Sequence, residues 1–132
     1  MSTTERQRLG RLGEDAVMSR YARSGFSLIA RNVRQFPNEI DLILQNDTYL
    51  VFVEVKTRHA VPGARSKYGR PYDAVNKAKR ERVVEAAQAY LRANPTKLQP
   101  RIDVAEVYVS RRVDGSDEVT TVLIFPNAFG AR

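Results

Sequence analysis

The stretch Asn38-Glu-Ile-Asp-Leu-Ile-Leu-Gln-Asn-Asp-Thr-Tyr-Leu-Val-Phe-Val-Glu-Val-Lys-Thr-Arg58 decides the fold of this chain. It predicts two β-strands joined by a turn at Asn46-Asp47, because two runs of alternating residues flank a pair of residues that favour turns. Side chains on a strand alternate between two faces. Each predicted strand therefore separates its charged residues from most of its apolar ones.

The length of the turn decides whether the charges of the two strands meet. Four turn residues would place Asp41 directly opposite Glu54, and two would place them diagonally. An odd number would put them on opposite faces, because a one-residue slip moves every side chain to the other face. We predict the even register, since it also produces one wholly apolar face. The charged face would carry Glu39, Asp41, Glu54 and Lys56, and the apolar face Ile40, Leu42, Leu44, Val51, Val53 and Val55.

Three carboxylates and one ammonium group on a central pair of strands need compensation. An unpaired buried carboxylate costs several kcal/mol, so such groups are paired or bind metal. A divalent cation such as Mg²⁺ or Mn²⁺ takes oxygen ligands of this kind. The alternative is a half-exposed face with ordinary salt bridges. For Glu39 the two interpretations are support of the metal ligands and a salt bridge to a nearby arginine.

Composition narrows the remaining chemistry. At 132 residues the chain predicts one domain, residues 1–132, with a sizeable core. It contains no cysteine, which excludes disulfides and zinc–thiolate sites, and its one histidine, His59, argues against histidine-rich metal sites and a Ser-His-Asp triad. No apolar run is long enough to span a membrane, and no apolar segment follows the charges of the first residues. We therefore expect a cytoplasmic protein with no membrane partner.

Positive charge is concentrated immediately after the acidic residues. The net charge is +7 and the sequence pI about 10.0. Residues 56–82 hold nine basic and two acidic residues, whereas the rest of the chain holds 13 of each. This distribution favours a polyanion brought to the acidic site, and a solvated basic face is the alternative. The residues predicted to contact phosphates are Arg58, Arg65, Lys67, Arg70, Lys77 and Lys79, and Tyr68 and Tyr72 could stack on unpaired bases.

The order of the elements predicts the fold class. Helix, three strands, helix and two strands indicate an α/β fold with a mixed central β-sheet flanked by helices. In the first helix, Gly10 and Gly13 predict close approach to the sheet, and Glu14 either faces solvent or reaches the acidic site. The expected elements are a helix over 3–24, a strand over 26–34, the two strands within 38–58, a helix over 73–94, strands over 101–110 and 119–125, and a tail over 127–132.

Short motifs follow one another in a fixed order over most of the chain. They are Gly13-Glu14 with Tyr21, Ala30-Arg31-Asn32, Glu39 to Ile43, Val51 to Arg58, Ala74-Val75 with Lys79, Asp103-Val104, and Asn127-Ala128-Phe129. As an ordered set they resemble the YraN-like family of small bacterial proteins. One departure is Asn38, where that family usually has glycine, and it affects only the local turn.

The acidic residues carry a second resemblance. Asp41 on one strand, the Glu54–Lys56 motif on the next and Glu14 on an earlier helix are similar to the PD-(D/E)XK nuclease superfamily, and the YraN-like family is similar to archaeal Holliday-junction resolvases in its core. The resemblance implies a restriction-endonuclease-like core and a Mg²⁺-dependent endonuclease, with Mn²⁺ as a substitute. On this basis the catalytic residues would be Asp41, Glu54, Lys56 and Glu14, with Asp41, Glu54 and Glu14 as metal ligands and Lys56 either orienting the attacking water or stabilising the transition state.

Three functions remain open at this point. The first is an endonuclease that hydrolyses phosphodiester bonds in branched or structured DNA, with DNA favoured over RNA. The second is a nucleic-acid-binding protein that keeps the nuclease fold without cutting. The third is an interaction protein whose basic surface meets an acidic partner. A resolvase that cuts two strands of a junction would act as a homodimer, but no dimer surface can be read in this sequence.

Overall fold

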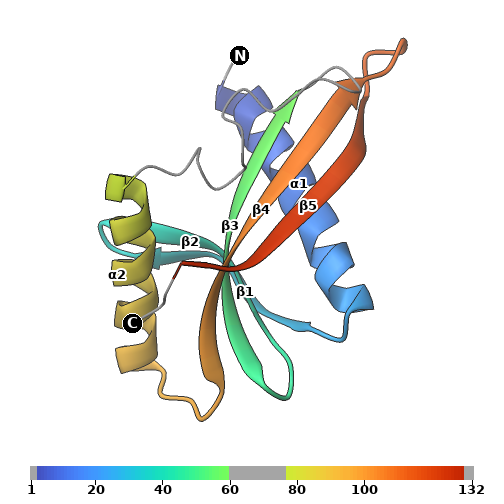
Figure 1. The fold of residues 1–132 in the computed structure, drawn as a ribbon. Coiled ribbons are helices and arrows are strands. Elements are labelled where there is room, and N and C mark those ends of the chain that lie inside the picture. Colours follow the sequence, from blue (N-terminus) through green and yellow to red (C-terminus); the bar gives the residue numbers. More distant parts are fainter. Residues whose placement is uncertain (1–2, 60–76, 130–132) are drawn as a thin grey trace.

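The computed structural model describes residues 3–59 and 77–129, and it confirms a mixed α/β fold with a five-stranded central sheet flanked by helices (Figure 1). The strand order is β1-β2-β3-β4-β5; β3 and β4 are parallel, and the other neighbours are antiparallel. The elements are α1 (Thr3–Arg23), β1 (Ser27–Gln35), β2 (Asn38–Gln45), β3 (Tyr49–His59), α2 (Lys77–Ala93), β4 (Gln99–Arg111) and β5 (Asp117–Phe129).

The turn between β2 and β3 has the even length that the charge pattern predicts. Gln45 pairs with Leu50, so four residues form the turn. The side-chain oxygen of Asn46 accepts hydrogen bonds from the backbone N–H of Thr48 at 2.9 Å and of Tyr49 at 2.7 Å. An asparagine that satisfies backbone donors ahead of it is a typical local cause of a turn. The even register is therefore confirmed.

Each face of the sheet is covered by one helix, which produces two apolar clusters (Figure 1). α1 ends at Arg23, two residues before Gly25, whose φ of +88° favours glycine, and the N–H of Phe26 donates to the carbonyl of Tyr21 at 3.1 Å. None of the helices in the described ranges is long and apolar enough to cross a membrane. The cluster under α1 includes Val17, Leu42, Leu44, Val51, Val53 and Val107, and the cluster under α2 includes Ile43, Phe52, Val83, Ala86 and Ile102.

The two helix glycines behave differently from each other. A Cβ atom added to Gly13 would lie 1.8 Å from Thr57 Oγ1, so the predicted close approach of α1 to the sheet is confirmed there. A Cβ atom added to Gly10 would meet nothing within 4 Å, so the same prediction is wrong for Gly10. The reason is that α1 crosses β3 at one point, and only the residue at the crossing needs to lack a side chain.

Two other predictions need correction. The helical spacing of residues 73–94 predicts Ala78 on the buried face of the second helix, but Ala78 is exposed at the beginning of α2. The predicted tail from Asn127 is part of β5, which continues to Phe129 because Ile102 pairs with that residue across a β-bulge. The basic segment after Arg58, whose proline and glycine residues predict a long loop, falls within residues 60–76, outside the described residues.

Candidate functional site

The paired strands β2 and β3 separate where the acidic residues begin. Their ladder ends at the pair Leu42–Val53. Because hydrogen-bonded pairs alternate along an antiparallel ladder and Asn46 N–H donates to the Tyr49 carbonyl, the next such pair would join Ile40 to Val55. Instead, Val55 N–H donates to Asp41 Oδ2 at 2.8 Å. The Asp41 carboxylate thus takes the place of a backbone acceptor at the end of the ladder.

This separation changes the packing of one apolar residue. Ile40 was expected on the same face as Leu42, but it packs in the cluster under α2. Ile40 lies beyond the last β2–β3 pair and keeps only its pairing with Val33 of β1, so β3 no longer determines its position. The prediction of one uninterrupted apolar face is therefore wrong at Ile40, while it holds for Leu42 and Leu44.

Asp41 lies in a poor environment for a negative charge. Burial, and then the charge of Glu54, raise the pKa of Asp41 from 3.8 to about 7. The Val55 N–H acts in the opposite direction but does not compensate for these effects. Asp41 and Glu54 adjoin the last pair of the ladder, Leu42–Val53, so a continued even register would place them opposite each other. A positive charge between them would remove the repulsion.

Glu54 is paired with two ammonium groups. Its side chain is only 5% exposed, and Oε1 lies 3.1 Å from Lys79 Nζ and 3.7 Å from Lys56 Nζ. Lys56 comes from the same strand, whereas Lys79 reaches down from the first turn of α2. The structure thus brings together Asp41, Glu54, Lys56 and Lys79 from three elements.

Glu14 faces the site rather than solvent. The approach of α1 at Gly13 carries the next residue, Glu14, to the edge of the sheet. There Glu14 Oε1 accepts from Arg31 Nη2 at 3.0 Å and from Asn32 Nδ2 at 3.4 Å. Its charge also contributes to the raised pKa of Asp41, after burial and Glu54. Glu14 is therefore close enough to act on Asp41 electrostatically, but an arginine holds it.

Glu39 lies toward the surface. Its Oε2 is 3.6 Å from Arg34 Nε, and both side chains are more than a third exposed. Of the two interpretations of Glu39, the salt bridge is the one present. An exposed pair of this kind contributes little to stability.

A cleft gives access to Asp41. Its volume is about 290 Å³, and it lies between the beginning of β2 and the first turns of α2. One wall carries two cationic side chains and the other carries carboxylates, so a ligand entering it would meet both signs of charge. The lining residues are Pro37, Asn38, Glu39, Asp41, Lys79, Arg82 and Val83.

The donor set suits a metal ion that needs few protein ligands. Within residues 3–59 and 77–129, no group of three or more His, Cys, Asp or Glu side chains gathers closely enough to enclose an ion. Mg²⁺ keeps several waters and binds through one or two carboxylates together with substrate phosphates. The carboxylates of Asp41 and Glu54, which interact electrostatically, fit that mode of binding, whereas an all-protein cage that includes Glu14 would require Glu14 to leave Arg31.

The structure describes only some of the residues predicted to contact nucleic acid. Arg58 is half-buried on β3, and Lys77 is exposed at the start of α2. Lys79 combines a position on the cleft wall with its contact to Glu54. Those that lie outside the described residues are Arg65, Lys67, Arg70, Tyr68 and Tyr72.

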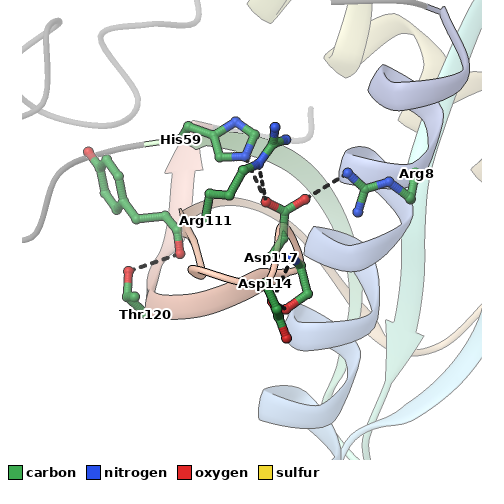
Figure 2. A network of polar contacts seen from close by, with 8 residues as sticks. Arg8, His59, Arg111, Asp114, Asp117 and Thr120 are labelled. Atoms are coloured by element: carbon green, nitrogen blue, oxygen red, sulfur yellow. Dashed lines mark hydrogen bonds and ion pairs between the residues drawn. The ribbon is translucent and has the colours of Figure 1, made fainter.

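His59 belongs to a different cluster (Figure 2). Its Nε2 lies 3.0 Å from Asp117 Oδ1, and Arg8 and Arg111 point at the same carboxylate, at 2.8 Å and 3.4 Å. The hydrogen bond from His59 and the charge of Arg8 lower the pKa of Asp117 to about 2. His59 therefore has a structural partner away from Asp41.

Sequence reasoning missed two residues near the site. Glu106 is fully buried and pairs in register with Lys56 on the neighbouring strand, and the Tyr108 hydroxyl donates to its carboxylate. Its signal was a charged residue inside the apolar run Val104–Val109. The helical spacing also predicts that Arg82 faces outward, and its side chain is exposed, but it lines the cleft as well. The spacing of residues in the predicted helix could not show that Lys79 and Arg82 form one wall of the cleft, because that depends on how α2 packs on the sheet.

Comparisons with known proteins give a family. The model of a family described as "Uncharacterised protein family UPF0102" matches residues 13–107. A UPF0102 protein of Syntrophotalea carbinolica is 38% identical over 128 residues, covering 96% of this chain and 95% of that protein. The UPF0102 protein STH1475 of Symbiobacterium thermophilum is 40% identical over 126 residues, covering 95% of this chain and 98% of that protein.

A solved structure is also similar, at a lower level. It is described as the structure of Pyrococcus furiosus SfsA in complex with Ca²⁺, with a TM-score of 0.46 and 14% sequence identity. The match covers 86% of this chain and 63% of that one. A likeness of this size carries no inference about function.

Proposed function

This chain belongs to the uncharacterised protein family UPF0102, the YraN family, and we propose from its site that it is a metal-dependent endonuclease that hydrolyses phosphodiester bonds in DNA. One observation carries the proposal. Asp41 and Glu54 lie on one side of a separating pair of strands, with burial and mutual repulsion raising the pKa of Asp41 to about 7. A strongly perturbed acid beside a cleft is a typical mark of a functional site.

The chain's own residues would divide the work as follows. Asp41 and Glu54 would bind Mg²⁺ or Mn²⁺, which when bound lowers the pKa of a water ligand and stabilises the extra negative charge of the transition state. Val55 N–H fixes the orientation of the Asp41 carboxylate. Lys56 would orient the attacking water. Glu14 would complete the site through a water molecule, since Arg31 holds its carboxylate.

The finer parts of the proposal concern architecture and partners. We place the site in a PD-(D/E)XK core within a single domain over residues 1–132, in a cytoplasmic protein. The net charge of +7 supports a nucleic-acid partner, with DNA favoured over RNA. Action on both strands of a branched DNA would require a homodimer.

Cleavage assays test the proposal. Branched and linear DNA are incubated with the protein and Mg²⁺, Mn²⁺ or EDTA. We expect products only with metal, and a loss of at least about 100-fold in rate for Asp41→Asn and for Lys56→Ala, because each removes a ligand or a proton-handling group. Glu118→Gln, which changes an exposed carboxylate paired with Arg112, is the matched control and should cut at the normal rate. Undiminished cleavage by both site variants would point to a contaminating nuclease and reject the proposal.

A second function has its own supporting observation. Lys56 and Lys79 already neutralise Glu54 without metal, and the described residues contain no three-carboxylate group. These features suit a protein that binds nucleic acid and does not cut it. Salt-dependent binding by the wild type, with no metal-dependent product on any DNA, would favour this alternative.

A further inference from the structure

Phe36 projects from the molecule beside the candidate site. It lies with Pro37 in the two-residue turn that joins β1 and β2, where Gln35 pairs with Asn38. Its side chain is 90% exposed. The next residues, Pro37 and Asn38, line the cleft that also contains Asp41. A single exposed aromatic residue needs no explanation, so what matters is that the two residues following Phe36 line this cleft.

The opposite wall of the cleft is cationic. Lys79 and Arg82 are three residues apart on α2 and so lie on one side of that helix. The tip of the β1–β2 hairpin lies beside α2, at the left of Figure 1, and β1 and β2 both contact the helix. An aromatic plane on one side and two cations on the other are the groups that bind a nucleotide through its base and its phosphate.

The acidic residues of the cleft do not oppose such a ligand equally. Glu39 lines the cleft, but Arg34 lies 3.6 Å away and offsets its charge. Asp41 is the residue that the proposed function places next to the reacting phosphodiester. A nucleotide held between Phe36 and the cations would therefore have its sugar–phosphate beside Asp41.

We propose that this cleft is a subsite for an unpaired nucleotide, in which Phe36 stacks on the base while Lys79 and Arg82 bind the adjacent phosphate. This inference rests on the proposed function and deepens it by naming the substrate class. Bases inside a duplex are covered on both faces by their neighbours, so a protein ring stacks on bases that are unpaired or at an end. The preferred substrate is then DNA with a single-stranded segment next to the cleavage position.

The chain offers a direct spectroscopic test because it contains no tryptophan. Phe36→Trp places the only indole in the cleft rim, and Val113→Trp places one at a site that is 109% exposed in the β4–β5 turn, away from the cleft. Both are titrated in EDTA with a single-stranded oligonucleotide and with a blunt duplex of equal length. We expect single-stranded DNA to quench Phe36→Trp emission strongly, the duplex to quench it weakly, and neither to quench Val113→Trp comparably.

Affinity gives a second readout, measured by anisotropy of labelled DNA in EDTA. Phe36→Ala should weaken binding of single-stranded DNA by about fivefold to 100-fold, the range for losing one stacked base, and should leave duplex binding within about twofold. Phe36→Tyr should keep the wild-type affinity, and Val113→Ala is the matched control. Since Phe36 and Val113 are both exposed, thermal unfolding should be unchanged in all five variants.

The outcomes separate the two proposals. If the wild type binds and cuts DNA but Phe36→Ala binds single strands normally and Phe36→Trp is not quenched, the subsite is rejected and the nuclease proposal stands. If the wild type binds no nucleic acid, both are rejected. Equal weakening for single strands and duplex would also reject the subsite, because it would show that Phe36 does not distinguish unpaired bases.

Discussion

Asp41 and Asp103 are both shielded aspartates on the central sheet, but the fold treats them in opposite ways. Asp103 is fully buried and has every oxygen satisfied. It accepts hydrogen bonds from the Tyr21 hydroxyl at 2.5 Å, from Arg101 Nε and Nη2 at 2.9 and 3.0 Å, and from the Asn127 N–H at 2.9 Å. Asp41 accepts a hydrogen bond from one backbone N–H, and burial, followed by the charges of Glu54 and Glu14, raises its pKa.

The difference separates a structural role from a functional one. Asp103 joins α1, β4 and β5 at one point, which explains why motifs far apart in the sequence contain Tyr21, Asp103 and Asn127. Arg101, its counter-charge, is itself held over the Tyr49 ring at 4.6 Å. A buried charge without compensation lowers stability, so such a group is retained where it has a use. Asp41 is a buried acid without full compensation, so a functional role explains it better than a structural one.

The environment of Asp117 is the opposite of that of Asp41 (Figure 2). Its carboxylate has one histidine and two arginines around it, and the pKa falls to about 2. The chain thus contains one aspartate with excess positive charge around it and one with too little. Their different environments predict opposite responses to pH.

The largest effect is expected from breaking the Asp103 cluster. Asp103→Ala should lower the free energy of unfolding by about 3–5 kcal/mol, because it leaves the Arg101 guanidinium and the Tyr21 hydroxyl without their buried acceptor. Urea denaturation at pH 7 measures this change. Glu118→Ala, at an exposed ion pair, should change stability by less than about 0.5 kcal/mol. Equal effects of the two substitutions would mean that Asp103 is not a structural anchor.

The raised pKa of Asp41 should make the stability of the fold depend on pH. Its pKa is raised from 3.8 to about 7, so the folded state holds a proton that the unfolded state has lost. Stability should therefore fall as pH rises from about 4 to about 7, by up to about 1.4 kcal/mol per pH unit, and level off above that. Asp41→Asn should remove this fall. Denaturant unfolding across this range, with divalent metal chelated, is the measurement.

Asp117 gives the mirror-image control. Its pKa is lowered from 3.8 to about 2, so its contribution to stability is present above about pH 4 and is lost as pH falls toward 2. Asp117→Asn should flatten the acid side of the stability profile and leave the range from 4 to 7 unchanged. If Asp41→Asn and Asp117→Asn altered the same range, the contrast between the two environments would be refuted.

The smallest effect concerns the glycine that brings Glu14 to Asp41. Gly13→Ala should destabilise the fold by about 1–3 kcal/mol, because the added methyl group would overlap Thr57. In the double variant with Thr57→Ala the loss should be smaller than the sum of the single losses. Gly10→Ala is the matched control and should stabilise by up to about 1 kcal/mol, since that position has open space and alanine favours a helix. Destabilisation by Gly10→Ala would contradict the packing described here.

Local sequence features predicted most of the framework. The alternation of side chains and the turn residues fixed the even register, and helix periodicity with Gly25 fixed the end of α1. The order of elements predicted the mixed sheet. These succeeded because each depends on contacts between residues close in the sequence. Two predictions were wrong: the end of the last strand before Asn127 and the burial of Ala78. Pairing with the distant strand β4 extends β5 to Phe129, and the beginning of α2 is exposed.

The sequence by itself determined which residues of the central hairpin share a face, and therefore that Asp41 and Glu54 lie together. Only the tertiary structure decided what surrounds them. β2 separates from β3 at Asp41, Lys79 contacts Glu54, and the turn that carries Phe36 borders the cleft. Parity along a strand is set by backbone geometry, which is local. The charge, burial and access of a side chain depend on how α1 and α2 dock on the two faces of the sheet, and that docking is settled by packing between distant segments.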